Sequence, residues 1–246
     1  GRHPLAWYRG GPDVDRAIVE SALRMPEGSQ PWHLAVGLVG QHHPVVGRPR
    51  WADRYPTLPV VDESWDLDDL PASARPLPGT WGNDERSRSE FVRAYLASVS
   101  SSDHQIGRLL NGLDMTNTVV IVWSDHGYSM GHKRHFGKAR LDAAVLRVPL
   151  LVSGPGVVPA DVERPVSLLG LRATVAELVE LPPPTPDSVP FDAQTGDVVS
   201  RWRGSVSTIS PDLVQRIDHA GGGTEIYDLR VDPGARTNLA TGVEPI

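Results

Sequence analysis

The densest group of chemically active side chains lies in the stretch SDHGYSMGHKRHFGK, which ends at Lys138. Asp125 and His126 are adjacent, and Lys133, His135 and Lys138 follow close behind them. A carboxylate and an imidazole side by side suit a divalent cation of hard or intermediate character. Lysine and histidine nearby would hold an oxyanion and stabilise charge that builds up on it. A solvated basic turn is the alternative that these residue types leave open.

Lysine is rare in this chain, and both copies fall in this stretch. Of the 24 basic residues, Lys133 and Lys138 are lysine and the others are arginine. A compact ammonium differs chemically from a planar guanidinium. Either the coincidence is a by-product of an arginine-rich composition, or at least one of these positions needs an ammonium.

Apolar runs on both sides of the stretch predict buried strands. Residues 118–124 (TVVIVWS) form a continuous β-branched run of the kind buried on both faces, and residues 148–154 (VPLLVSG) form another. A third predicted strand, residues 32–40 (WHLAVGLVG), runs into His42. Ligands of layered α/β domains bind beyond the carboxyl ends of the strands. We therefore expect Asp125, His126 and His42 to approach one site.

Helical spacing of apolar residues predicts three helices. They cover residues 13–25, residues from Ser89 to a stop at Gly112, and residues 166–181, which end at a run of prolines. Alternation of helices with buried strands predicts a layered α/β fold. The Pro- and Gly-rich residues 41–89 lack periodicity, and a loop of that length inside a domain is usually functional or lies over a surface.

The last third of the chain has a different pattern. Residues 182–196 are rich in Pro, Asp and Gly and predict a linker. Short strands follow at residues 204–210, 213–218 and 224–230, with a Gly221–Gly222–Gly223 turn, and predict a small antiparallel sheet. We therefore divide the chain into an α/β part, residues 1–184, and a small subdomain, residues 185–246.

Composition excludes several classes of function. The chain has 246 residues, 39% of them apolar, a net charge of -6 and no cysteine. No basic block or stripe favours nucleic acid, and the apolar runs are shorter than the ~20 residues of a membrane-spanning helix. Without cysteine there is no disulfide, thiolate metal site or cysteine nucleophile in these residues. The chain begins at Gly1, so a signal peptide is either absent or lies outside it.

Taken together, these segments resemble the type I sulfatases of the alkaline phosphatase superfamily. The stretch SDHGYSMGHKRHFGKARLDAAVLRVPL is similar to the S-D-H-G, H-W-x-K and R-V-P-L pattern of the iduronate-2-sulfatase-like branch. WHLAVGLVGQHHP, VSLLGLRATVAELVEL and GGTEIYDLRVDPGARTNLA resemble further family segments in the same order. The resemblance implies an α/β/α sandwich with a mostly parallel or mixed sheet, and a small antiparallel sheet in the C-terminal subdomain.

The resemblance also implies roles for individual residues. Asp125 and His126 match two metal ligands, usually for calcium. Lys138 matches a lysine that contacts the substrate sulfate, and His42 matches a histidine that binds sulfate or protonates the leaving oxygen. Lys133 and His135 match a second pair near the pocket. The implied activity is metal-dependent hydrolysis of a sulfate ester of a small molecule or sugar, in an exported protein.

The departures from the family pattern concern the nucleophile. No segment resembles the C/S-x-P/A-x-R motif that yields formylglycine, and the Asp-Asp pair of the first family strand is missing. The resemblance is therefore to the C-terminal half of a sulfatase, whose N-terminal half would be a further segment or a separate chain. Two alternatives stay open: a phosphodiesterase or phosphonate monoester hydrolase of the same superfamily, and an inactive truncated pseudoenzyme that binds an anion.

Overall fold

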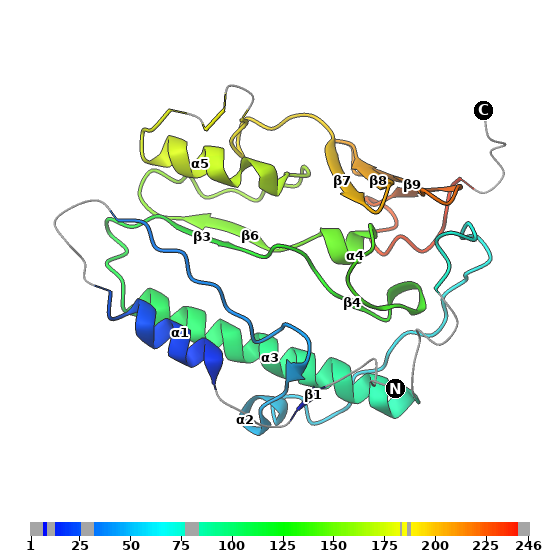
Figure 1. Cartoon of the computed structure of the whole chain (residues 1–246), viewed down its shortest axis with the longest axis horizontal. Helices are drawn as coiled ribbons and strands as arrows, with labels where there is room; N and C mark the ends of the chain where they lie inside the picture. The colour runs from blue at the N-terminus through cyan, green and yellow to red at the C-terminus, as the bar shows by residue number, and fades with distance from the viewer. Residues whose placement is uncertain are drawn as a thin grey trace. The chain divides into compact units, whose positions relative to one another are not determined.

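The computed structural model of the protein describes residues 7–8, 13–25, 32–76, 84–182, 184–185 and 188–240 (Figure 1). The chain divides into two compact units. The first unit comprises Gly1–Glu63, Pro78–Ile121 and Val152–Val157, and the second comprises Ser64–Leu77, Val122–Leu151 and Val158–Ile246. The boundary predicted at residue 184 lies inside the second unit, because segments 64–77 and 122–151 group with the C-terminal residues.

The first unit is built around one long helix. Helix α3 (Glu85–Asn111) packs against α1 (Val14–Ala22), α2 (Pro49–Ala52) and the short strand β2 (Val45–Val46), which pairs in parallel with β1 (Trp7–Tyr8). In Figure 1, α1 runs beside α3. The helix predicted over 13–25 is thereby confirmed.

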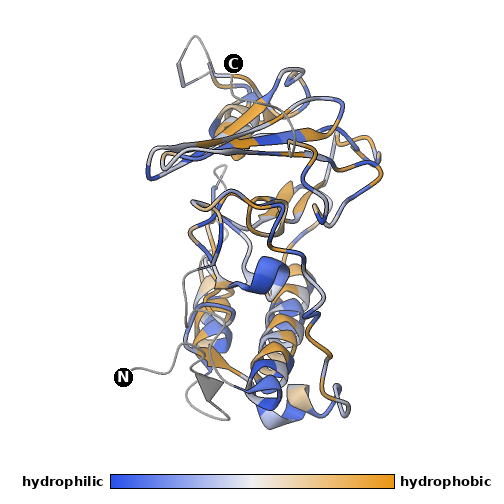
Figure 2. Cartoon of the chain, turned by 90° about the vertical axis from the view of Figure 1, so that its right-hand side faces the viewer, coloured by the Kyte–Doolittle hydropathy of each residue, from blue (hydrophilic) through white to orange (hydrophobic). Residues whose placement is uncertain are grey.

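Small residues at helical spacing let α3 approach its neighbours closely. Ala94 and Ala97 are buried on the same face as Phe91, and a Cβ on Gly47 would lie only 2.8 Å from the Cα of Ala94. The helix begins before the predicted Ser89, because the Asp84 carboxylate caps it by accepting a hydrogen bond from the Ser87 amide at 3.0 Å. Hydrophobic and hydrophilic residues alternate along the helices (Figure 2), as amphipathic helices require.

The second unit contains a four-stranded antiparallel sheet in the order β10-β9-β8-β7. The strands are β7 (Val198–Trp202), β8 (Ser205–Ile209), β9 (Val214–Asp218) and β10 (Thr224–Asp228). The last three confirm the predicted strands, and β7 was missed because its sequence lies just after the Pro-rich linker. Residues 64–76 pack beside the segment that follows this sheet, where the Asn238 backbone amide donates to the Asp69 carboxylate at 2.7 Å.

Two further strands flank the candidate site. Strands β3 (Val120–Trp123) and β6 (Leu150–Ser153) form a two-stranded sheet. Between them lie β4 (Ser129–Met130), the 3₁₀ turn η1 (His132–Arg134), β5 (Phe136–Gly137) and α4 (Ala143–Leu146). Full burial of β3 and β6 was predicted and is wrong: Trp123 is 45% exposed and Leu151 is 59% exposed. Among the described residues, no segment fully covers these two side chains.

Two other expectations need correction. Residues 32–40 form no strand, and this segment follows an irregular path. Its alternation of apolar and small residues does not suffice without a pairing partner. The helix predicted over 166–181 is shorter: a 3₁₀ turn η2 (Leu168–Gly170) precedes α5 (Leu171–Leu178).

Candidate anion and metal site

A short hairpin presents the predicted site residues of the second unit. Strands β4 and β5 pair antiparallel, with Ser129 opposite Gly137 and Met130 opposite Phe136. Residues 131–135 form the tip of this hairpin, and the Ser129 hydroxyl donates to the His135 carbonyl at 2.8 Å. His126 precedes one arm and Lys138 follows the other, so the base of the hairpin brings the two together.

Asp125, His126 and Lys138 converge at this base. The Lys138 Nζ lies 3.1 Å from the His126 Nε2, and the Asp125 Oδ2 lies 3.6 Å from the same nitrogen. An ammonium can only donate and a carbonyl can only accept. The His126 Nδ1 lies 2.9 Å from the Gly127 carbonyl, so Nδ1 carries the proton and Nε2 offers its lone pair outward.

Gly127 is required here by close packing. A Cβ at this position would lie 2.8 Å from the Ala144 carbonyl oxygen. The Gly127 amide donates to the Val145 carbonyl at 2.7 Å, which ties the hairpin base to α4. Glycine at this position therefore allows a close backbone approach between the hairpin base and α4.

The donor set fits part of a divalent metal site. Two ligands of one calcium ion, each roughly 2.3–2.6 Å from it, lie about 3–4 Å apart when they are neighbours. The Asp125 Oδ2 and His126 Nε2 are 3.6 Å apart, and Asp125 is exposed. No group of three or more His, Asp or Glu side chains that could hold a metal occurs among the described residues. These two donors therefore need ligands from elsewhere.

Lys133, at the hairpin tip, is enclosed in a buried cluster of charges. Its Nζ donates to the Glu225 Oε2 at 2.6 Å and to the Tyr227 hydroxyl at 2.6 Å. The Asp142 Oδ1 lies 3.4 Å away. The side chain of Lys133 is 2% exposed and that of Glu225 is 0% exposed. Contact between Lys133 and substrate stays a prediction, for which this cluster would have to open.

The charges and hydrogen bonds of this cluster keep its two carboxyl groups ionised. Burial by itself raises the pKa of Glu225, but hydrogen bonds from His219 and Lys133 and the charge of Lys133 lower it to about 2. Burial also opposes the ionised form of Asp142, yet the charges of Arg140 and Lys133 hold its pKa well below the usual range. Burial and the Glu225 charge raise the pKa of Tyr227. Two carboxylates, two cations and a neutral phenol therefore share one interior.

Comparison with known proteins fits this arrangement. The family model named Sulfatase matches residues 5–181. The chain belongs to the sulfatase family. A sulfatase of Formosa agariphila is 32% identical over 164 residues, which are 61% of this chain and 32% of that protein. The chain thus spans about a third of the length of this relative.

Solved structures share the fold of this sulfatase-family chain. The phosphonate monoester hydrolase of Silicibacter pomeroyi superposes with a TM-score of 0.72 at 19% identity, over 98% of this chain and 62% of that one. A protein solved with its substrate D-glucosamine-2-N,6-O-disulfate superposes with a TM-score of 0.53 at 20% identity, over 64% and 38%. The α/β fold with a small antiparallel sheet is the alkaline-phosphatase-like fold of sulfatases. No helix in the described part of the chain is long and apolar enough to cross a membrane.

Two histidines of the hairpin tip are held neutral. The His132 Nε2 donates to the Gly234 carbonyl at 2.6 Å, and its ring packs against Trp65 in a tilted arrangement with centroids 4.4 Å apart. Burial lowers the pKa of His132, and the Asp142 charge and the hydrogen bond to Gly234 only partly offset this effect. Burial and the charge of Arg140 also lower the pKa of His135. His135, predicted to contact substrate, lies half-buried in the same hairpin as Lys138.

We expect the protein to lose stability as the pH falls from 7.5 to 5. The folded pKa values of His132 and His135 lie below 6.5, so the unfolded chain binds protons first. Stability is therefore full above pH 6.5 and decreases below it, by at most about 1.4 kcal/mol per pH unit for each histidine. Denaturant unfolding at several pH values measures this slope. His132→Gln should flatten it, and an unchanged slope in that variant would contradict the assignment.

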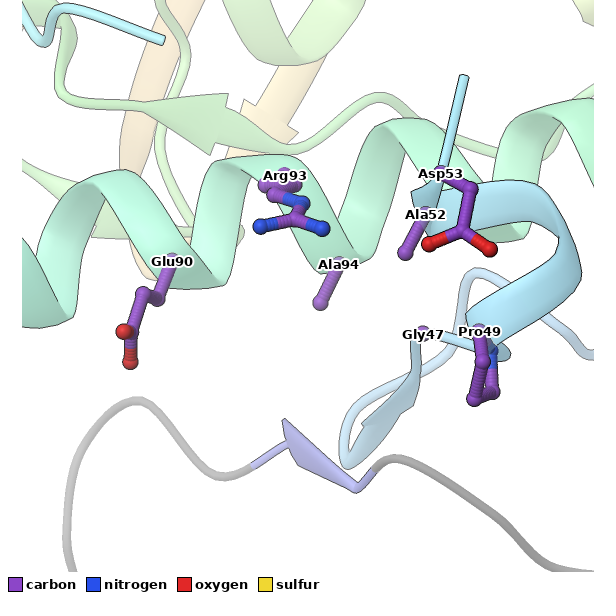
Figure 3. Close-up of a pocket in the computed structure, with 7 residues that line it drawn as sticks. All are labelled: Gly47, Pro49, Ala52, Asp53, Glu90, Arg93 and Ala94. Carbon is purple, nitrogen blue, oxygen red and sulfur yellow. The ribbon is translucent and has the colours of Figure 1, made fainter. Parts of the chain in front are cut away.

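His42 belongs to the first unit, whereas the other predicted site residues belong to the second. It is exposed, and its amide donates to the Val39 carbonyl at 3.0 Å. A pocket of about 250 Å³ in the same unit is lined by Asp53, Glu90 and Arg93, with small residues between them (Figure 3). It contains none of the predicted site residues, and its mixed charges favour neither an anion nor a cation.

Sequence reasoning missed the partners of Lys133. Glu225 and Tyr227 alternate along β10, on the face whose residues are buried. A glutamate on the buried face of a strand needs a buried cation as its partner. The position of Glu225 in the predicted strand could therefore have indicated such a contact. Asp142 and Arg140 carried no comparable signal, since charged residues next to a short helix are usually solvated.

Proposed function

We propose that the protein hydrolyses sulfate esters in a metal-dependent reaction. The observation that carries this proposal is the convergence of the Lys138 ammonium, the His126 Nε2 and the Asp125 carboxylate within 3.1–3.6 Å at one exposed hairpin base. A tetrahedral ester group with one or two negative charges is stabilised by an exposed ammonium that lies beside two side chains able to bind a metal ion. Membership of the sulfatase family supports sulfate over other esters.

In this proposal each residue has a defined task. The Lys138 ammonium donates hydrogen bonds to the sulfate oxygens and stabilises the negative charge that grows on them. His42 holds the sulfate or passes a proton to the departing alcohol oxygen. His135, on the same hairpin as Lys138, lines the approach to the sulfate. A divalent ion, calcium above all, would be held by Asp125 and His126 and would supply further positive charge.

The nucleophile and the remaining metal ligands lie outside these residues in the proposal. Formylglycine would supply the attacking oxygen, and an N-terminal half of the domain, in the same or a separate chain, would carry it. The exposed apolar side chains of Trp123 and Leu151 support a further covering segment, because such strands are normally buried in a layered sheet.

We infer that the substrate is a sulfated sugar or a sulfated small molecule. The structural neighbour solved with a disulfated glucosamine supports a sugar. The order and spacing of SDHG, HFGK and RVPL support the iduronate-2-sulfatase-like branch. We place the protein outside the cytoplasm, in keeping with the exported character of this family.

Phosphonate monoester hydrolysis is the second candidate. It is favoured by the likeness in fold to the hydrolase of Silicibacter pomeroyi. The test is to assay the protein together with the N-terminal half that would carry the nucleophile, with an aryl sulfate and with the matching aryl phosphonate monoester, with and without EDTA. Faster, EDTA-sensitive release of the phenol from the sulfate supports the first proposal. Preference for the phosphonate supports the second, and no release from either supports a pseudoenzyme.

Replacing Asp125 with alanine is expected to weaken calcium binding and to lower kcat/KM by about 100-fold or more. Because the carboxylate is 75% exposed, its loss should leave the free energy of unfolding nearly unchanged. Calorimetric calcium titration and steady-state kinetics measure both effects. Asp161→Ala, at an exposed position of the same unit, is the matched control. Equal losses in both variants would contradict the role of Asp125.

A further inference from the structure

The hairpin that presents Lys138 is held from its opposite end by the C-terminal sheet. Lys133 occupies the tip, and its ammonium reaches Glu225 and Tyr227 on β10, both at 2.6 Å. These partners are 92 and 94 residues away in sequence. The base of the hairpin is joined by the Lys138–His126 contact at 3.1 Å. A series of contacts thus runs from β10 through the tip to the exposed base.

The backbone of the tip supports this reading. Lys133 has φ of 48° and Arg134 has φ of 53°, and Gly131 before them has φ of 109°. Two successive non-glycine residues in the left-handed region are unfavourable and persist only where their surroundings hold them. The surroundings of Lys133 are three polar partners in a fully buried interior. The tip conformation therefore depends on this cluster.

We propose that the Lys133–Glu225 pair, with Tyr227, is a positioning device that sets the hairpin so that Lys138 and His126 face each other across its base. The role of Lys138 in sulfate binding rests on the proposed function. The positioning of the hairpin by β10 does not depend on it. Glu225, Lys133 and Tyr227 act through the hairpin and do not touch substrate. The C-terminal sheet is therefore part of the sulfate-binding apparatus, although it lies outside the hairpin that carries the exposed groups.

The first measurement is the tautomer of His126 by ¹⁵N NMR of its ring, with EDTA present so that Lys138 is the cation available to Nε2. In the unaltered protein Nδ1 carries the proton. In Glu225→Gln the Lys133 ammonium loses the nearer of its two carboxylate partners, the hairpin loosens, and the two tautomers should average. Tyr227→Phe, which keeps the ring and removes one acceptor, should shift the average in the same direction and covers the case in which Glu225→Gln fails to fold.

The second measurement is kinetic. Mispositioning of Lys138 should raise KM for an aryl sulfate by ~10- to 100-fold, as supporting residues around a site typically do. A smaller folded fraction alone would lower the apparent kcat and leave KM unchanged. Ser207→Ala removes a buried hydroxyl of β8 that accepts from Gln215 at 3.0 Å and does not contact Lys133, so it controls for general loosening of the sheet.

The outcomes separate the two proposals. A changed tautomer in both β10 variants but not in Ser207→Ala supports the positioning role, even if no sulfate ester is hydrolysed and the proposed function fails. An unchanged tautomer and unchanged KM in Glu225→Gln and Tyr227→Phe would overturn the positioning role, even in a protein that is an active sulfatase.

Discussion

Replacing Lys133 with methionine is expected to lower the free energy of unfolding by about 3–5 kcal/mol, because it removes the ammonium that pairs with the buried Glu225 carboxylate and one of the two cations beside Asp142. Glu225 is 0% exposed and Asp142 is 3% exposed, so water cannot replace the lost partner. Methionine keeps most of the aliphatic volume, which confines the change to the charge. Chemical denaturation monitored by circular dichroism measures the effect.

The second lysine of the chain provides the control for this experiment. Lys138→Met removes the same chemical group from an exposed position and should change the free energy of unfolding by less than about 1 kcal/mol. Adding Glu225→Met to Lys133→Met should recover part of the lost stability, since an uncompensated carboxylate is then gone. Equal stability of the two lysine variants would show that the Lys133 cluster is not a buried ionic network.

Replacing Lys138 with alanine is expected to lower kcat/KM for sulfate ester hydrolysis by about 10²–10³-fold, the usual effect of removing one donor that stabilises developing negative charge. The fold should be retained, because Lys138 is exposed and its Nζ lies against the ring of His126 near the surface. Lys138→Arg should recover little, because a planar guanidinium does not reproduce a compact ammonium. Steady-state kinetics with an aryl sulfate measures each variant.

Arg134→Ala is the matched control for Lys138→Ala. Arg134 is an exposed cation of the same hairpin, so its loss changes the local net charge by the same amount. We expect kcat/KM in this variant to change only a few-fold. A comparable loss in both variants would mean that general electrostatic attraction, rather than direct binding by Lys138, brings in the sulfate.

Short-range patterns in the sequence determined the exposed part of the candidate site. Asp125 and His126 follow an apolar β-branched run, and that run is a strand, β3. Lys138 was selected as one of two lysines, and it lies against His126. Local patterns also predicted the strands β8, β9 and β10, which pair with their neighbours along the chain, and the end of α3 at Gly112. Such features depend mainly on residues that are close in sequence, and for that reason they can be predicted from the sequence by itself.

Only the tertiary structure distinguished the two lysines. Both carry the same charge in the same stretch, but Lys133 donates to Glu225 and Tyr227, more than 90 positions away, and Lys138 is exposed. Residues 32–40 and the open faces of β3 and β6 differ from expectation for a related reason. Whether an apolar run pairs and is covered depends on distant strands, and local periodicity does not encode that contact. The ionic cluster at Glu225 likewise exists because β10 brings a carboxylate to the hairpin tip, a long-range contact that the folded chain alone decides.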